Sequence, residues 1–149
     1  MKSYGETFVV DTSKSPYAKL RPVPIENVHL EDSFWSPRIS ILHEETLLSQ
    51  YRIFEETGRI FNFQRASGKK KGEFKGLYFN DSDVYKWVEA VAFALANKKS
   101  GKLYRLVRRT LSEILSAQDN DGYLDTYFFF EKKKERWSNL RDMHEFCLL

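Results

Sequence analysis

SDVYKWVEAVAFALANKKSGKLYRLVRRTLSEILSA, residues 82–117, is a stretch whose apolar residues recur at helical spacing. Its first part, about 82–97, places these residues on one helical face: Val84, Val88, Val91, Ala92 and Leu95. Its second part, about 102–117, carries a cleaner apolar stripe: Leu103, Leu106, Val107, Leu111, Ile114 and Leu115. Because Gly101 lies in the short join, we predict an antiparallel pair of helices.

Downstream, the run Asp119-Asn120-Asp121-Gly122 predicts a turn. The next eight residues, 123–130, read YLDTYFFF, and they predict either a short strand or a loop packed by its aromatic rings. Another helix is expected from near Ser138 or Asn139 to Leu149. Its pattern is apolar up to the last residue, with no capping glycine. We therefore expect the chain to be the N-terminal part of a larger protein, truncated inside a helix.

Upstream, the prolines divide the chain. All four lie within the first 37 residues, and the proline-free remainder favours helix. We therefore expect an irregular or extended arm over 1–36. A helix follows over about 37–57, with Ser36 as its N-cap and Pro37 at its first position, and it stops at Gly58. The basic runs at 68–72 and 131–136 are expected to be solvated loops.

The composition excludes several classes of protein. The 149 residues carry a net charge of only +3, which is too small to indicate a nucleic-acid or membrane partner. A single cysteine, Cys147, excludes a disulfide framework and a multi-cysteine zinc site within the chain. No apolar run is long enough for a signal peptide or a membrane span. The expectation is a cytoplasmic globular chain, rich enough in aromatic residues (15%) for a large core or an aromatic-lined cleft.

Asn80-Asp81-Ser82-Asp83 is the densest polar cluster, and it lies at the predicted start of a helix. One interpretation is helix capping, since such side chains accept hydrogen bonds from free backbone N–H groups. The other is a pair of carboxylates that hold sugar hydroxyls, beside a stacking surface formed by Tyr78, Phe79, Tyr85 and Trp87. Asp81 and Asp83 lie too close along the chain to flank a glycosidic bond as acid and base.

His144-Glu145 is the second polar cluster. His144 is either a capping or packed residue or an imidazole that binds a ligand or transfers a proton near neutral pH. No second histidine follows four residues later, so a zinc protease is excluded. His29 and His43 are expected to be surface or packing residues, and Cys147 a small buried apolar residue.

Five segments together resemble the start of glycoside hydrolase family 127, whose best-known members are β-L-arabinofuranosidases. They are FWSPR at 34–38, ETGRIFNF at 56–63, FNDSDVYKW at 79–87, QDNDGYLDT at 118–126 and RWSNLRDMHE at 136–145. The resemblance covers about residues 24–149, in order and with plausible spacing. The DSDVYKW run is the most distinctive part of it.

The resemblance implies an all-α fold, the N-terminal part of an (α/α)6 barrel occupying residues 37–149. It implies a retaining glycosidase of carbohydrate metabolism, with a zinc-bound cysteine as nucleophile. In the family, the three cysteines and the glutamate that bind zinc, and the acid/base glutamate, come from later parts of the chain. Cys147 matches none of them, so no catalytic residue and no metal ligand is assigned here. His144 matches a histidine that lines the sugar pocket, and Asn62, Asp81 and Asp83 match positions that shape its floor or rim.

We therefore expect this chain alone to be inactive, because it holds neither the zinc site nor the acid/base. An alternative is a non-catalytic carbohydrate-binding or interaction module derived from such an enzyme. A nucleic-acid-binding protein using Lys69–Lys71 and Lys132–Lys134 is disfavoured by the low net charge. The apolar stripe of the helix over 102–117 would remain partly uncovered, which favours self-association.

Overall fold

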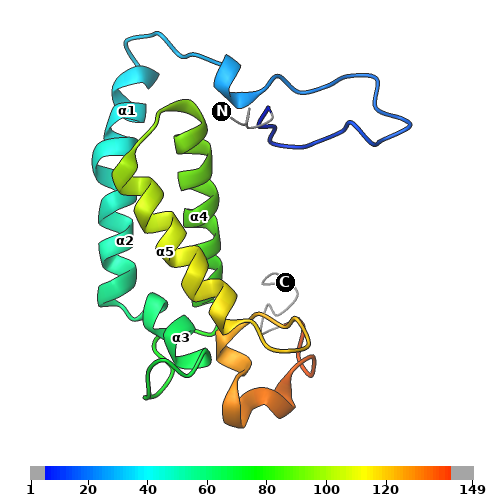
Figure 1. Cartoon of the computed structure of the whole chain (residues 1–149), viewed down its shortest axis with the longest axis vertical. Helices are drawn as coiled ribbons and strands as arrows, with labels where there is room; N and C mark the ends of the chain where they lie inside the picture. The colour runs from blue at the N-terminus through cyan, green and yellow to red at the C-terminus, as the bar shows by residue number, and fades with distance from the viewer. Residues whose placement is uncertain (1–5, 142–149) are drawn as a thin grey trace.

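The structure is a computed structural model that describes residues 6–141, and within this range every regular element is helical. Figure 1 shows a stack of long helices with an arm at one end and a compact loop region at the other. The α-helices are α1 (Trp35–Ile41), α2 (Leu47–Glu56), α3 (Arg59–Ala66), α4 (Asn80–Asn97) and α5 (Gly101–Ala117). Short helical turns are η1 (Ile25–Asn27), η2 (Leu42–Thr46), η3 (Thr126–Phe128) and η4 (Phe130–Glu135). The predicted all-α class is confirmed.

The arm at 6–34 has η1 as its only helical element, and η1 contacts α4, while the part before it extends away from the helices in Figure 1. The first helix begins at Trp35, because Asp32 Oδ1 accepts hydrogen bonds from the backbone N–H groups of Phe34, at 2.7 Å, and Trp35. The Ser36 hydroxyl instead donates to the Leu30 carbonyl at 2.8 Å. The prediction that Ser36 is the N-cap is therefore wrong.

The helix predicted over 37–57 is present as one nearly continuous run from α1 through η2 to α2. The η2 segment is a π-helical turn, and His43 is buried within it. The run stops at Gly58, as predicted, where φ is +83°. A Cβ atom at Gly58 would lie 2.8 Å from the Lys75 Cβ, so both the backbone angle and the space require glycine.

Helix α3 follows Gly58 directly and is missing from the sequence-based prediction. It buries Ile60 and Phe63 against the other helices, but it also buries Asn62, Gln64 and Arg65. These polar side chains interrupt the apolar periodicity on which a helix prediction depends.

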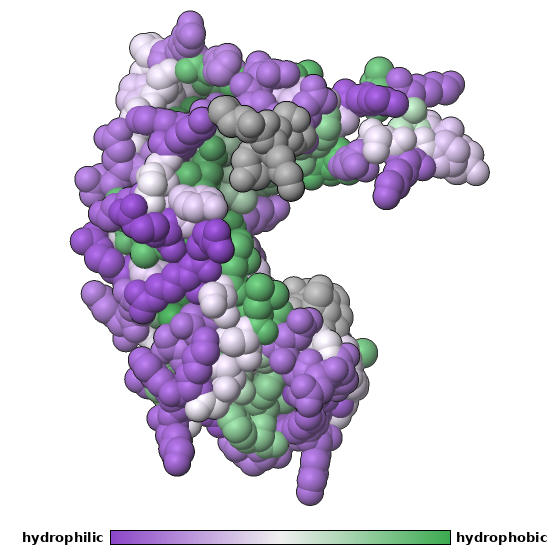
Figure 2. All heavy atoms as spheres, viewed as in Figure 1, coloured by the Kyte–Doolittle hydropathy of each residue, from purple (hydrophilic) through white to green (hydrophobic). Residues whose placement is uncertain are grey.

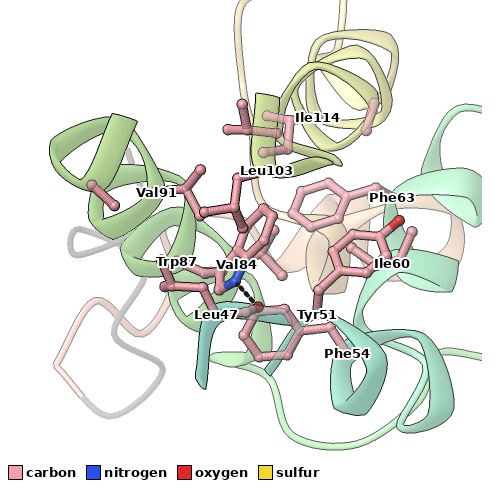
Figure 3. Packing of buried hydrophobic residues seen from close by; sticks show 13 residues of the cluster. Leu47, Tyr51, Phe54, Ile60, Phe63, Val84, Trp87, Val91, Leu103 and Ile114 are labelled. Carbon is pink, nitrogen blue, oxygen red and sulfur yellow. Dashed lines mark hydrogen bonds between the residues drawn. The ribbon is translucent and has the colours of Figure 1, made fainter. Parts of the chain in front are cut away.

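The main core lies where α2, α3, α4 and α5 meet (Figure 3). Trp87 on α4 is 2% exposed, and its indole N–H donates to the Leu47 carbonyl at 2.9 Å. The rings of Tyr51 and Phe54 on α2 lie 5.4 and 6.4 Å from the Trp87 ring. Trp87 thus joins α4 to α2 at the centre of the bundle.

The antiparallel pair α4 and α5 is confirmed, with Ser100 capping α5 by accepting from the Leu103 N–H at 3.3 Å. The buried face of α5 is narrower than the predicted stripe; it consists of Leu103, Val107, Thr110, Ile114 and Ala117. Leu111 and Leu115 are 39% and 68% exposed. The predicted partial exposure of this stripe is therefore present.

After α5, residues 123–130 form an aromatic-packed loop rather than a strand. Tyr123, Phe128 and Phe129 form a small buried cluster in this loop region. The helix predicted from near Ser138 or Asn139 has not begun by Arg141, and its remaining part lies outside the described residues. None of the helices between residues 6 and 141 combines the length and the apolarity needed to cross a membrane.

Candidate functional site

The predicted site residues Asn62, Asp81 and Asp83 lie around the N-terminus of α4, where α3 and the loop at 123–130 approach it. Asp81 is 1% exposed and faces this loop. Its two carboxylate oxygens accept hydrogen bonds from the Thr126 N–H and the Thr126 hydroxyl, both at 2.7 Å. Burial raises the Asp81 pKa to about 6, although both hydrogen bonds from Thr126 act to lower it. Asp81 therefore connects the loop at 123–130 to α4 through two hydrogen bonds.

Helix capping does not explain this cluster. The N-cap position of α4 is Phe79, and no side chain of the cluster caps the helix end. The Ser82 hydroxyl donates to the Phe79 carbonyl at 2.9 Å, and Asp81 points to Thr126. The capping interpretation of Asn80–Asp83 is therefore wrong, although Asp81 and Asp83 still suit the positive end of the helix dipole.

Asn62 holds a different segment, the loop between α3 and α4. Its side chain pairs with both backbone groups of Lys75: the amide donates to the carbonyl at 2.9 Å and the oxygen accepts from the N–H at 3.0 Å. The Asn80 amide donates to the same Lys75 carbonyl at 3.1 Å. Asn80 is 1% exposed, and its Oδ1 has no hydrogen-bond partner among residues 6–141. Two buried amides thus hold this loop against α3 and α4.

Asp83 is the most accessible of the three, with 35% of its side chain exposed. It forms an ion pair with Arg59 of α3, with 3.0 Å between Oδ2 and Nε. It also lines an open hollow of about 400 Å³ together with Gln50, Phe54, Lys86, Trp87 and Ala90. The structure therefore directs Asp81 and Asp83 to different partners, and they do not form a carboxylate pair.

The aromatic residues expected to form a stacking surface divide into two groups. Trp87 belongs to the core, and the Tyr85 hydroxyl donates to the Leu124 carbonyl at 3.4 Å. Tyr78 and Phe79 are half-buried in the loop between α3 and α4, with ring centroids 5.0 Å apart. The Tyr127 ring, beside Thr126, lies 6.2 Å from the Tyr78 ring. The prediction that Trp87 belongs to a stacking surface is therefore wrong. The remaining rings are Tyr78, Phe79 and Tyr127, and they lie on the two loops that Asn62 and Asp81 bind.

Arg136 was expected in a solvated loop, but only 7% of its side chain is exposed, and it packs against the loop at 123–130. Its guanidinium Nε donates to the Phe128 carbonyl at 2.9 Å, and its centre lies 3.8 Å from the Tyr123 ring centroid. It also forms an ion pair with Asp119 at 2.9 Å, to which Lys133 adds a second at 2.6 Å. The hydrogen bond from Lys133 is the main reason that the Asp119 pKa falls to about 2. No periodic signal marks such a contact, because its partners lie at irregular distances along the chain.

The family resemblance assigns no zinc ligand to the residues described. Among residues 6–141, no three side chains of the His, Cys, Asp and Glu types gather closely enough to hold a metal ion. His144, the predicted pocket histidine, and Cys147 lie outside the described residues.

Comparison with known proteins identifies the family. The model of the β-L-arabinofuranosidase GH127 catalytic domain matches residues 27–149. The chain belongs to glycoside hydrolase family 127. A curated relative, the non-reducing end β-L-arabinofuranosidase of Bifidobacterium longum subsp. longum, is 30% identical over 146 residues. That alignment covers 83% of this chain and 22% of the relative.

Two solved structures of family 127 enzymes share the fold. A β-L-arabinofuranosidase from Geobacillus stearothermophilus T6 is 39% identical, with a TM-score of 0.77 over 80% of this chain and 20% of that enzyme. A second β-arabinofuranosidase is 32% identical, with a TM-score of 0.75 over 85% of this chain and 21% of the other. This family 127 chain therefore spans about a fifth of the length of these relatives.

Proposed function

We propose that residues 37–149 form the N-terminal part of the catalytic (α/α)6 barrel of a cytoplasmic retaining glycosidase. Its substrates would carry terminal β-L-arabinofuranosyl groups. The observation that carries the proposal is the family match over residues 27–149, together with the arabinofuranosidase names of relatives at 30–39% identity. Residues 6–141 contain no group of side chains that could hold a metal ion. We therefore place any zinc of the whole enzyme outside this range.

The proposed sugar-contacting residue is His144, and the proposed pocket-shaping residues are Asn62, Asp81 and Asp83. Asp83 is the candidate for direct contact at a rim, since its carboxylate is partly exposed. Asn62 and Asp81 are buried and already hydrogen-bonded, so they would act by holding the two loops that carry Tyr78 and Tyr127. Half-buried aromatic rings with an exposed face are suited to packing against a sugar.

The 149-residue chain alone is expected to release no L-arabinose from a nitrophenyl β-L-arabinofuranoside above the rate in buffer. Glycosidases of this mechanism need two groups on opposite sides of the scissile bond. The described carboxylates of the proposed site face Thr126 and Arg59 instead. The Geobacillus enzyme serves as the positive control. Turnover by the purified chain would contradict this expectation.

A chimera tests the proposed role directly. Residues 27–149 replace the matching fifth of the Geobacillus enzyme, and the chimera is expected to hydrolyse the same substrate. His144→Ala in the chimera should reduce kcat/KM at least tenfold, whereas Glu89→Ala, at an exposed position of α4, should leave it within twofold. If the chimera is folded but inactive, and the chain alone binds arabinofuranosides saturably in a way that His144→Ala abolishes, the binding-module alternative replaces the enzyme.

Self-association is the proposed partner interaction of the chain when it is alone. Leu111 and Leu115 are exposed on α5. Figure 2 also shows hydrophobic residues along the hollowed side of the molecule. We expect the chain to form oligomers in sedimentation velocity at micromolar concentration. The double variant Leu111→Gln, Leu115→Gln should shift the distribution to monomer, because about 25 cal/mol is lost for each Å² of apolar burial. An unchanged distribution would contradict this interface.

A further inference from the structure

The outward face of α5 is strongly basic, a feature that the proposed function does not use. Residues 90–112 contain six cations and no carboxylate: Lys98, Lys99, Lys102, Arg105, Arg108 and Arg109. All six are exposed. Positions 102, 105 and 109 share one helical face, with Arg108 at its edge. We define the basic face as Lys102, Arg105, Arg108 and Arg109.

Ion pairing within the chain leaves most of this charge unneutralised. Arg109 pairs with Glu55 at 3.5 Å, and both side chains remain largely exposed. Between residues 6 and 141, no acidic group forms an ion pair with Lys102, Arg105 or Arg108. In the two basic loops, Lys69 pairs with Glu113 and Lys133 with Asp119, each within 2.8 Å, whereas the other lysines at 70, 71 and 134 form no ion pair with residues 6–141. Lys102, Arg105 and Arg108 thus place three cations without an ion pair on successive turns of one helix.

Helix stability does not account for these cations. The first turns of a helix favour acidic residues, because the exposed backbone N–H groups carry partial positive charge. The first turn of α5 has no acidic residue, and Lys102 and Arg105 both lie in its first two turns. Like charges at neighbouring helical positions also repel one another. Acidic residues in the first turn of α5 would stabilise the helix more than these cations do.

Hydroxyl groups and one aromatic ring complete the surface. Ser112 and Ser116 lie beyond Arg109, and both are exposed. Glu113 lies between them and pairs with Lys69, which also donates to the Ser116 hydroxyl at 2.8 Å. Tyr104 is 52% exposed, and its ring lies 5.8 Å from the Arg108 guanidinium. Arginine binds carboxylates through two parallel hydrogen bonds, while hydroxyl groups and aromatic rings contact neutral parts of sugars. The cations extend for about 10 Å along the helix, at 1.5 Å per residue.

We propose that the basic face of α5 binds an anionic polysaccharide whose repeating sugars carry carboxylates, and so holds a polymer that bears the substrate. The choice of an acidic sugar polymer rests on the proposed function, since the family acts on glycosides. A row of cations along a helix matches regularly repeated carboxylates on an extended chain. Nucleic acid is less favoured, because one tyrosine offers little stacking surface for successive bases.

The test measures binding of polygalacturonate fragments to the full 149-residue chain by isothermal titration calorimetry. The same fragments with every carboxylate methyl-esterified serve as the neutral probe. We expect saturable binding to the charged fragments, loss of binding to the esters, and weakening as salt rises from 50 to 500 mM.

Lys102→Ala, Arg105→Ala, Arg108→Ala, combined, should weaken binding about tenfold, the sum of three exposed charge contacts. These three residues are chosen because their removal breaks no ion pair described above. The matched control is Lys14→Ala, Lys19→Ala, Arg21→Ala, which removes three exposed cations from the arm outside the family match. It should change binding less than twofold. Circular dichroism checks that both variants remain folded.

Three results would overturn the proposal: equal binding of the methyl ester, equal losses in the two triple variants, or tighter binding of poly(U) RNA or anionic vesicles than of polygalacturonate. Failure here is separable from failure of the proposed function. The chimera assay uses a small neutral arabinofuranoside, so an active chimera without polygalacturonate binding would reject the basic face alone.

Discussion

Trp87→Ala is expected to destabilise the chain by about 3–5 kcal/mol, the usual cost of truncating a buried aromatic residue. Trp87 is 2% exposed and packs against Tyr51 and Phe54, and its N–H donates to Leu47. Domains of this size are stable by only about 5–15 kcal/mol, so the variant should lose much of its urea resistance. The measurement is the urea midpoint followed by far-UV circular dichroism.

Trp35→Ala is the matched control, since Trp35 is 54% exposed on α1. It should shift the free energy of unfolding by less than about 1 kcal/mol. Trp87→Phe keeps most of the ring packing and removes the N–H donor. Its loss of unfolding free energy should therefore lie between those of Trp87→Ala and Trp35→Ala. Equal urea midpoints for Trp87→Ala and Trp35→Ala would contradict the core position of Trp87, and would restore the sugar-stacking interpretation.

Local periodicity was enough to predict the helices whose buried faces are apolar. The α4–α5 pair and the run from α1 to α2 follow from apolar spacing, from prolines and from Gly58. Helix α3 could not be found in this way, because Asn62 and Arg65 are buried on it. Asn62 pairs with the Lys75 backbone, and the Arg65 guanidinium Nε donates to the Gly72 carbonyl at 2.8 Å. These distant loop partners make a polar helix face suitable for burial.

The contacts of the candidate site residues could not be predicted from the sequence, and their role in sugar binding stays a prediction. The family motifs indicate Asn62, Asp81 and Asp83, and these do lie around one end of α4. The partner of Asp81 is Thr126, 45 residues away, and no local pattern relates the two. A cluster of Asn, Asp and Ser before an apolar helix matches the sequence pattern of a helix cap. The same pattern arises when these side chains bind a distant loop, so the sequence alone does not distinguish the two.

Removing the Asp81–Thr126 contact is expected to cause a second large loss of stability. At pH 5, Asp81→Ala should cost about 2–4 kcal/mol, because a buried N–H and hydroxyl lose partners that were 2.7 Å away. Ser82→Ala is the control, since the half-buried Ser82 hydroxyl donates only to the Phe79 carbonyl within its own turn. Chemical denaturation gives both values. Hydrogen exchange at the Thr126 amide should accelerate in Asp81→Ala and stay slow in Ser82→Ala.

The pH dependence of the same contact has a definite sign. The native Asp81 pKa is raised to about 6 from 3.8, so between these values the folded chain binds more protons than the unfolded chain. The contribution of Asp81 to the free energy of unfolding therefore falls as pH rises from about 4 to 6, and it is constant above that window. Asp81→Asn is neutral at every pH. The stability of the native chain relative to Asp81→Asn should then increase by up to about 3 kcal/mol on going from pH 7 to pH 4. A difference that decreases instead would mean that the hydrogen bonds from Thr126 outweigh burial, and that the carboxylate is held in its charged form.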